Sequence, residues 1–268
     1  MCEPFRNRQA FLLCLLAVVN TAACGRRDEA SLANAPAALT LTTTDGAVLA
    51  ATFYPTHAKP SCGVVLVHDK GGDSAQWAGF ARRLQQSGIA SIAFDMRGHG
   101  ASTGPEGQKV SFEKFTVGDW LEAILDIQAA RNALPANGVD PDNLAIVGAG
   151  MGANLATHYT AQDQTIQALV LISPGLEYDG VPVRDAFEAY KLRPSLLIAT
   201  KGDTYASSSA QALKKTASTF CEFREYPGGA HGMDVIDEMV GVREELAFWL
   251  ESILRTLDTG AAIRDETE

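Results

Sequence analysis

Basic side chains are scarce in this sequence. Its 268 residues include 22 Lys and Arg against 32 Asp and Glu, which gives a formal net charge of −10. The adjacent basic pairs Arg26-Arg27, Arg82-Arg83 and Lys214-Lys215 are scattered and form no cluster. Proteins that bind phosphate backbones usually carry a basic face. We therefore expect no nucleic-acid partner.

Long apolar runs are also lacking, because the run at residues 10–19 is too short to cross a membrane. Ten helical residues span about 15 Å, whereas the bilayer core is about 30 Å thick. Arg6 and Arg8 precede this run, and small residues follow it up to Cys24. Charged, apolar and small-residue regions in this order are typical of a secretory signal peptide. We expect residues 1–23 to be removed and the protein to be exported.

The end of the expected signal peptide, Thr21-Ala22-Ala23-Cys24, resembles a bacterial lipobox, with Thr21 where Leu is commoner. The resemblance implies a diacylglyceryl group on Cys24. Such a lipid would attach the protein to a membrane of the cell envelope, facing the periplasm or the exterior. Residues 24–38 show no apolar periodicity, so we interpret them as the lipid-anchor Cys followed by a flexible linker.

Cysteine is sparse, and only Cys62 and Cys221 remain once the signal peptide and Cys24 are set aside. A domain of this length buries enough surface to be stable without disulfides or a metal. The sequence has no His, Cys or carboxylate group with metal-ligand spacing. Its one Gly-rich turn between a strand and a helix, at residues 148–152, lacks the G-x-G-x-x-G spacing of dinucleotide sites. We expect neither a metal nor another cofactor.

Strand and helix patterns alternate from residue 39 to residue 256, which predicts one α/β domain. A hairpin at 39–43 and 48–54, around Asp45-Gly46, comes first. Strands are then expected at 64–67, 90–94, 144–147, 168–172, 196–200 and 220–226, and helices at 76–87, 115–133, 151–161, 207–217 and 235–255. This alternation predicts a mostly parallel sheet with helices on both faces. Residues 257–268 are expected to form a frayed, disordered tail.

Four loops at predicted strand ends carry a family resemblance: Leu-Val-His-Asp-Lys-Gly-Gly at 66–72, Phe-Asp-Met-Arg-Gly-His-Gly-Ala-Ser at 94–102, Ile-Val-Gly-Ala-Gly-Met-Gly-Ala-Asn at 146–154 and Gly-Gly-Ala-His-Gly at 228–232. Together, and in this order, they resemble the α/β-hydrolase superfamily near its dienelactone-hydrolase and small-esterase branches. The resemblance implies eight strands in the order 1-2-4-3-5-6-7-8. Because few residues separate Gly175 from the strand at 196, no large cap domain is expected. The implied order places Cys62 and Cys221 about 19 Å apart, too far for a disulfide.

The resemblance assigns the nucleophile to the turn Gly148-Ala149-Gly150-Met151-Gly152. The family motif G-x-S-x-G has its nucleophilic Ser at the centre of a strand-to-helix turn, where this sequence has Gly150. Glycine adopts the positive φ of this position without the strain of about 1–3 kcal/mol that other residues pay. A residue without a side chain cannot start a covalent mechanism. The nucleophile position is therefore vacant in the sequence.

The other catalytic parts that the resemblance implies are present. Asp203 matches the acid and His231 the general base, in the chain order of the superfamily. The backbone N–H groups of Met151 and Lys70 match the oxyanion hole. Asp69 stands where the family usually has Gly after its His. If that carboxylate points inward, it opposes the negative charge that develops during ester hydrolysis.

Other polar residues at strand ends are weaker candidates. Three serines, Ser74, Ser102 and Ser173, lie in such loops but outside the strand-to-helix turn at 148–152. A substitute nucleophile among them is a minor alternative. His57, His99 and His158 are expected to have structural or surface roles.

Three functions remain open from the sequence. The leading hypothesis is an exported lipoprotein with an esterase-like fold that lacks its nucleophile, and is thus an impaired hydrolase or a pseudo-hydrolase. The second is an ester hydrolase in which His231, oriented by Asp203, activates water directly. The third is a binding module for small acyl or aromatic carboxylates, with the helix N-terminus after Gly150 as its anion site. All three imply a small-molecule ester or carboxylate as ligand.

Overall fold

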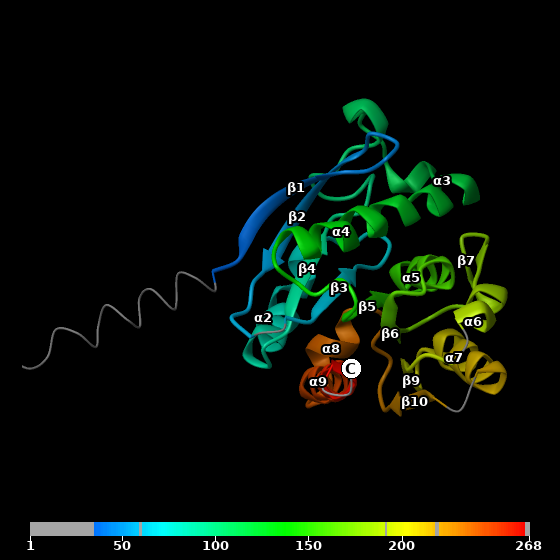
Figure 1. Ribbon diagram of the computed structural model, residues 1–268. Helices are drawn as coiled ribbons and strands as arrows, with labels where there is room; N and C mark the ends of the chain where they lie inside the picture. Colours follow the sequence, from blue (N-terminus) through cyan, green and yellow to red (C-terminus); the bar gives the residue numbers. More distant parts are fainter. Residues whose placement is uncertain (1–34, 59–60, 191, 218–219, 266–268) are drawn as a thin grey trace, which may run out of the picture. The chain divides into compact units, whose positions relative to one another are not determined.

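A computed structural model describes residues 35–58, 61–190, 192–217 and 220–265. Its main sheet has eight strands in the order β1-β2-β4-β3-β5-β6-β9-β10 (Figure 1). β2 is antiparallel to both β1 and β4, and all other neighbours are parallel. The predicted fold class and strand order are thereby confirmed. The predicted signal peptide, Cys24 and the linker up to residue 34 lie outside the described residues.

The strands form close to where the sequence predicts them. They are β1 (Ala37–Thr42), β2 (Val48–Tyr54), β3 (Gly63–Val67), β4 (Ala90–Phe94), β5 (Leu144–Ala149), β6 (Ile166–Ile172), β9 (Ser195–Thr200) and β10 (Cys221–Tyr226). β1 begins inside the segment interpreted as a linker, because Ala37 and Ala38 pair with β2. Cys62 directly precedes β3 and Cys221 begins β10, four strand positions apart in the sheet.

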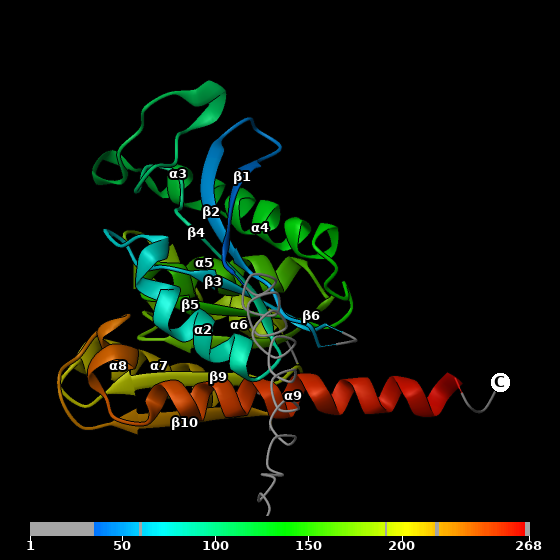
Figure 2. The ribbon, with the colours of Figure 1, turned by 90° about the vertical axis from the view of Figure 1, so that its left-hand side faces the viewer.

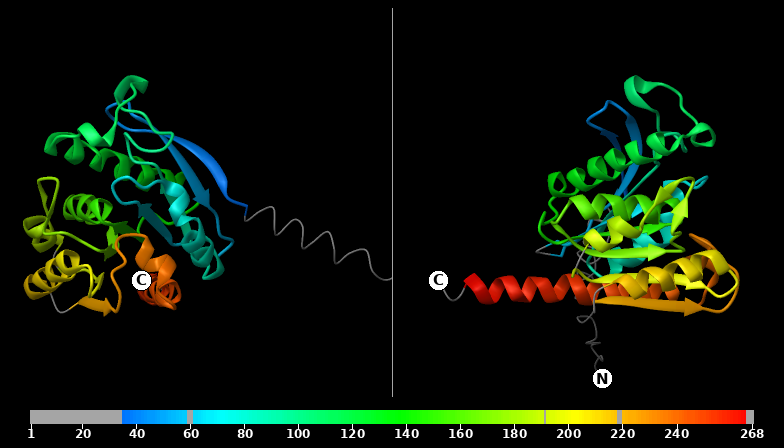
Figure 3. Two further views of the ribbon diagram at one scale, coloured as in Figure 1. Left: turned by 180° about the vertical axis from the view of Figure 1, so that it is seen from behind. Right: turned by 90° about the vertical axis from the view of Figure 1, so that its right-hand side faces the viewer.

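Helices cover both faces of the sheet, as its buried strands require (Figures 1 and 3). One face carries α2 (Ala78–Gln86), α8 (Asp234–Glu238) and α9 (Val242–Asp265), and Figure 2 shows α2 and α9 on this face. The other carries α3 (Val117–Glu122), α4 (Ile124–Ala136), α5 (Met151–Gln162), α6 (Arg184–Tyr190) and α7 (Thr204–Thr216). Among the described residues, no helix combines the length and apolarity that a membrane span needs.

Side-chain alternation along β3 explains why the core has two halves. Val65 and Val67 pack with Trp120 of α3 in one cluster, whereas Val64 and Leu66 pack with Trp77 in the other. All four β3 side chains are fully buried. Because successive side chains of a strand point to opposite faces, a continuous apolar run is what a central parallel strand needs.

The structure differs from the sequence prediction at short elements and at the C-terminus. The segment between β6 and β9 contains a small hairpin, β7 (Glu177–Tyr178) and β8 (Val181–Pro182), and the helix α6. The tail expected at 257–268 instead continues α9 as far as Asp265. Extending an existing helix avoids the cost of nucleation, which is the main barrier to a new one. Residues 266–268 lie outside the described part.

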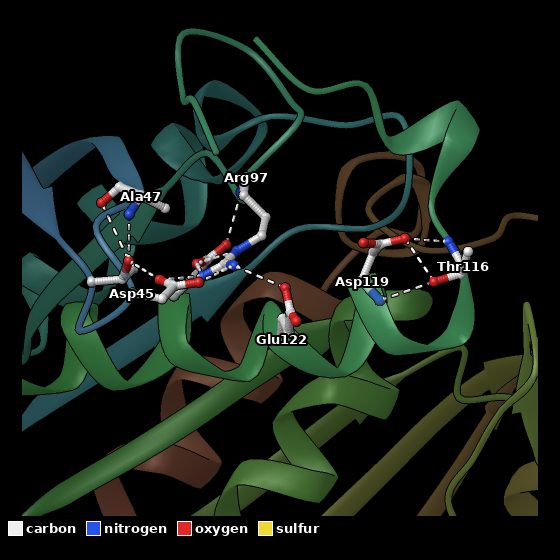
Figure 4. A network of polar contacts seen from close by, with 8 residues as sticks. Asp45, Ala47, Arg97, Thr116, Asp119 and Glu122 are labelled. Atoms are coloured by element: carbon white, nitrogen blue, oxygen red, sulfur yellow. Dashed lines mark hydrogen bonds and ion pairs between the residues drawn. The ribbon is translucent and has the colours of Figure 1, made fainter. Parts of the chain in front are cut away.

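A buried ion-pair network fixes the loop after β4 (Figure 4). The Arg97 side chain, 3% exposed, contacts Asp126 of α4 at 2.7 Å and Asp45 of the β1–β2 turn at 2.6 Å. Burial raises the pKa of Asp126 to about 6 even though Arg97 opposes this shift. Charges buried this deeply require their partners, since an unpaired buried charge is strongly unfavourable. The network therefore joins the hairpin, the β4 loop and α4.

We expect Asp126→Ala to lower the free energy of unfolding by about 3–5 kcal/mol, because it leaves the Arg97 guanidinium buried with one partner fewer. Glu122→Ala is the matched control: its carboxylate is 62% exposed and lies 3.9 Å from Arg97. An exposed pair contributes about 0–1 kcal/mol. Urea unfolding of both variants measures the difference, and equal losses would contradict the assigned role of Asp126.

Candidate active site

Loops at the carboxyl ends of three parallel strands, β3, β5 and β10, meet at one cavity. Asp69 and Lys70 follow β3, Met151 follows β5 and His231 follows β10. A cavity of about 310 Å³ is lined by these four residues together with Tyr178 and Asp179 of the β7–β8 hairpin. The carboxyl edge of a parallel sheet is where α/β proteins place their ligand sites. The structure thus brings the predicted site residues of three loops together, and Asp203 after β9 reaches the cavity through His231.

Gly150 forms a sharp turn between β5 and α5. Its φ of 50° and ψ of −119° lie outside the region that L-residues favour, and its N–H donates to the Ile172 carbonyl at 2.9 Å. Close packing also restricts the neighbouring Gly152, where a Cβ would lie 2.3 Å from the His68 carbonyl oxygen. The backbone therefore has the conformation of a nucleophile elbow, and the residue at its centre carries no side chain.

His231 is oriented by Asp203. The two side chains meet at 2.5 Å between Nδ1 and Oδ2, and Asp203 also caps α7 by accepting from the Ala206 N–H at 3.2 Å. Thr200 donates to the Ala230 carbonyl at 2.8 Å and so holds the loop that carries His231. A carboxylate on Nδ1 leaves Nε2 facing the cavity, as acid–base catalysis by a His requires.

The Asp69 carboxylate points inward and fills the space beside Gly150. A Cβ built on Gly150 would lie 2.0 Å from Asp69 Oδ1 and 2.3 Å from Oδ2, so the carboxylate occupies the place of a nucleophile side chain. Asp69 Oδ2 lies 3.3 Å from His231 Nε2. Asp69, His231 and Asp203 therefore form a continuous chain of acid, imidazole and acid.

The two predicted oxyanion-hole donors both bind this carboxylate. The Met151 and Lys70 N–H groups each donate to Asp69 Oδ1 at 2.7 Å. The N-terminus of α5 adds a favourable partial charge for an anion. The anion site therefore exists, and the chain's own Asp69 occupies it.

Two carboxylates control the charge of His231. Asp69, together with Asp203, raises the pKa of His231 to about 9, and partial burial opposes the rise only in part. At neutral pH the imidazole therefore carries a proton on both nitrogens. In this state His231 is an acid and an ion-pair partner, and it is not available as a base.

The remaining candidates have structural contacts. Ser102 donates to the Asp95 carbonyl at 2.6 Å, and the Ser74 N–H donates to the Asp95 carboxylate at 2.8 Å. Ser173 is buried and accepts from the Gly232 N–H at 3.0 Å, which places its hydroxyl behind the His231 loop. None of the three serines lines the cavity of the candidate site.

The other histidines also have contacts away from the cavity. His99 stacks on Phe112 with a ring-centroid distance of 4.2 Å, and His158 contacts the Pro182 carbonyl at 2.6 Å. His57 is exposed. In the described ranges, no three His, Cys, Asp or Glu residues are grouped as a metal site would require.

Sequence reasoning missed the part of the site that comes from the β7–β8 hairpin. Tyr178 lies 6.1 Å from the His231 ring, edge to face, and Asp179 pairs with the Lys70 ammonium at 2.8 Å. Both residues sit in strands or turns too short to give a periodic pattern. Asp179 has a φ of 46°, and the Asp-Gly pair at 179–180 is the one local signal that indicates a turn here.

The strand order, the elbow and the His–Asp pair after the last two strands define an α/β hydrolase. A family model described as serine aminopeptidase, S33, matches residues 58–193, half of the chain. The chain therefore belongs to this family of the α/β-hydrolase superfamily.

Individual relatives agree with this assignment. An uncharacterized abhydrolase domain-containing protein of Dictyostelium discoideum is 28% identical over 180 residues, which cover 65% of this chain and 18% of that protein. The chain thus spans about a fifth of the length of this relative.

Among solved structures, an esterase of Pyrococcus furiosus has a TM-score of 0.65 at 20% identity, covering 84% of this chain and 95% of its own. The dienelactone hydrolase of Anabaena variabilis has a TM-score of 0.63 at 17% identity, covering 83% of this chain and 97% of its own. Such identities show a shared fold.

We expect Asp69→Asn to lower the pKa of His231 from about 9 toward its ordinary value of 6.5, because the carboxylate that contributes most to the shift is lost. NMR titration of the imidazole measures this. Asp179→Asn removes the same charge from the cavity rim and serves as the control, with the pKa of His231 unchanged.

Thermal unfolding provides a second readout. Because the folded pKa exceeds the unfolded value, the ion pairs of His231 stabilise the protein fully below about pH 6.5 and lose this effect as the pH rises through about 9. Asp69→Asn should flatten that part of the stability profile. A profile identical to that of the wild type would contradict the Asp69–His231 contact.

Proposed function

We propose that this protein is an exported, lipid-anchored member of the α/β-hydrolase superfamily that has lost serine-type ester hydrolysis. The observation that carries the proposal is the position of the Asp69 carboxylate, which fills both the space beside Gly150 and the N–H of Met151. A serine mechanism needs a nucleophilic side chain in the space beside Gly150, and it needs the Met151 N–H free to bind the oxyanion.

The electrostatics of the site are a second reason, besides the missing serine, to expect no serine-type ester hydrolysis. Attack on an ester develops negative charge on the carbonyl oxygen, and the oxyanion hole must stabilise that charge. In this site the donors of Met151 and Lys70 already bind the anionic Asp69. A second anion there would meet like-charge repulsion in a partly buried site.

Direct activation of water by His231 has less support. This alternative needs a neutral imidazole whose Nε2 accepts a proton from water. Asp69 and Asp203 keep His231 protonated at neutral pH, since its pKa is raised to about 9. Binding of a carboxylate ligand at the N-terminus of α5 also has less support, because Asp69 occupies that anion site.

We expect esterase activity only when a serine replaces Gly150 and the Asp69 carboxylate is also removed. In Gly150→Ser alone, the new Cβ would overlap Asp69, and in Asp69→Gly alone no nucleophile exists. The double variant Asp69→Gly with Gly150→Ser opens space for a serine hydroxyl near His231 Nε2. Its kcat/KM for p-nitrophenyl acetate should exceed that of the wild type by about 10²–10³-fold, a fraction of what a full triad contributes.

A fluorophosphonate probe tests the same four proteins for a reactive serine. Labelling is expected for the double variant and absent in the wild type and both single variants. Labelling of the wild type, or ester turnover by the wild type that His231→Ala abolishes, would overturn the proposal. Adding His231→Ala to the double variant is the matched control and should return it to the background rate.

Export and lipidation rest on residues 1–24 and are tested separately. Expressed in a bacterium, the full chain should be recovered with membranes and be extracted by detergent, with a mature N-terminus at a modified Cys24. Cys24→Ser should release the protein into the soluble envelope fraction, because a lipid-bearing thiol is lost. Mass spectrometry of the N-terminal peptide decides the matter, and an unmodified Cys24 in the membrane fraction would contradict the lipid anchor.

A further inference from the structure

Two buried histidines join the loop that carries Asp69 to the loop after β4. His68 directly follows β3 and is fully buried, and His99, in the loop after β4, is 4% exposed. Their ring centroids lie 4.9 Å apart, edge to face. Neither ring lines the cavity of the candidate site. This histidine pair is therefore a buried titratable group outside the cavity.

Hydrogen bonds fix the proton of His68 on Nδ1. This nitrogen contacts the Asp69 carbonyl oxygen at 2.7 Å, and Nε2 accepts from the Met96 N–H at 2.9 Å. Because a carbonyl oxygen only accepts and a backbone N–H only donates, Nδ1 carries the proton and Nε2 carries none. His68 is therefore neutral. A second proton, on Nε2, would set two N–H groups against each other and break the bond to Met96.

His99 is neutral as well. Its Nδ1 contacts the Arg97 carbonyl oxygen at 3.0 Å and must donate to it. Its Nε2 has no hydrogen-bond partner in the described part of the chain, and the ring stacks on Phe112. A proton on Nε2 would bury a charge and an unpaired N–H, which is strongly unfavourable. Because the His99 N–H donates to the Met96 carbonyl at 3.0 Å, both histidines hold the same residue of the β4 loop.

Three carboxylates act on the histidine pair and favour its charged form. They are Asp69 and Asp73 of the β3 loop, which act on His68, and Asp95 of the β4 loop, which acts on both rings. Burial outweighs these carboxylates. It lowers the pKa of His68, and together with the neighbouring His68 it lowers the pKa of His99 to about 4. The aromatic side chains that also pack on His99 carry no charge: Phe112 and Trp120.

We infer that the histidine pair is an acid-operated latch, which holds the Asp69 carboxylate on the Met151 N–H at neutral pH and releases it in acid. Protonation of the pair separates the β3 loop from the β4 loop at Met96. Asp69 moves with the β3 loop, because its backbone carbonyl binds His68. The inference rests on the occupation of the anion site by Asp69, which carries the proposed function, and it names the condition that ends this occupation.

The size of the effect follows from the two states of His99. Its pKa is about 4 in the closed loop, whereas an exposed imidazole has a pKa of about 6.5. His99 therefore stabilises the closed loop fully above about pH 6.5, and this contribution is lost as the pH falls toward about 4. Through His99 alone, the ratio of open to closed loop should rise about 30-fold from pH 7.5 to pH 5. His231 adds nothing here, because its pKa of about 9 keeps it protonated throughout this range.

Amide hydrogen exchange followed by NMR tests the latch. The Met96 N–H reports on the bond to His68, and the Met151 N–H, at the start of α5, reports on the bond to Asp69. After correction for the intrinsic exchange rate, the protection of both amides in the wild type should fall about 30-fold or more from pH 7.5 to pH 5. The Leu197 N–H, in β9 between β6 and β10, is the internal reference and should keep its protection.

Two variants separate the latch from other effects of acid. His68→Gln keeps a donor and an acceptor but gains no proton, and His99→Leu gains none either. Each variant should lose most of the acid response of the two amides, and either one decides the matter if the other does not unfold cooperatively at pH 7.5. His57→Gln, which removes an exposed histidine, is the matched control and should respond as the wild type does. A response of wild-type size in His68→Gln and His99→Leu would overturn the inference, because another group would then open the loop.

The same spectra distinguish failure of this inference from failure of the proposed function. An unprotected Met151 N–H at pH 7.5 would contradict the position of Asp69 that carries the proposed function. Protection at pH 7.5 that persists at pH 5 would overturn the latch alone, as would a proton on Nε2 of His68 in nitrogen-15 spectra of the imidazole at pH 7.5. The fluorophosphonate result reports on serine chemistry and does not depend on the latch.

Discussion

The contact between the Asp69 carboxylate and the elbow at Gly150 is the constraint on which the site depends. The carboxylate fits there because residue 150 has no Cβ, and it stays there because the Met151 and Lys70 N–H groups bind it. His231, held between Asp69 and Asp203, offsets part of their negative charge. Gly150, which has no side chain, thus determines where the Asp69 carboxylate lies, and that carboxylate keeps His231 protonated.

The sheet supplies the precision that this contact needs. β3, β5, β9 and β10 are parallel or connected through parallel neighbours, so their carboxyl ends place Asp69, Gly150, Asp203 and His231 at one edge. The network around Arg97 ties the β4 loop to α4 and to the β1–β2 turn near the same edge. His68 is buried and accepts from the Met96 N–H at 2.9 Å, linking the Asp69 loop to the β4 loop.

The sequence predicts the fold and the chain order of the site well, and for physical reasons. Buried parallel strands appear as continuous apolar runs, and each is followed by a loop in which Asp69, Gly150, Asp203 or His231 can be recognised. The direction of the Asp69 side chain could not be read from the sequence, because it depends on the absence of a Cβ at Gly150, in the turn after another strand. Tyr178 and Asp179 were missed, since two-residue strands carry no period.

A crystal structure of the wild-type protein at high resolution tests the central claim most directly. The account predicts electron density for the Asp69 carboxylate beside Gly150, with Oδ1 within hydrogen-bond distance of the Met151 nitrogen and Oδ2 toward His231. Density that places Asp69 in solvent, with a water or buffer anion on the Met151 nitrogen, would contradict it.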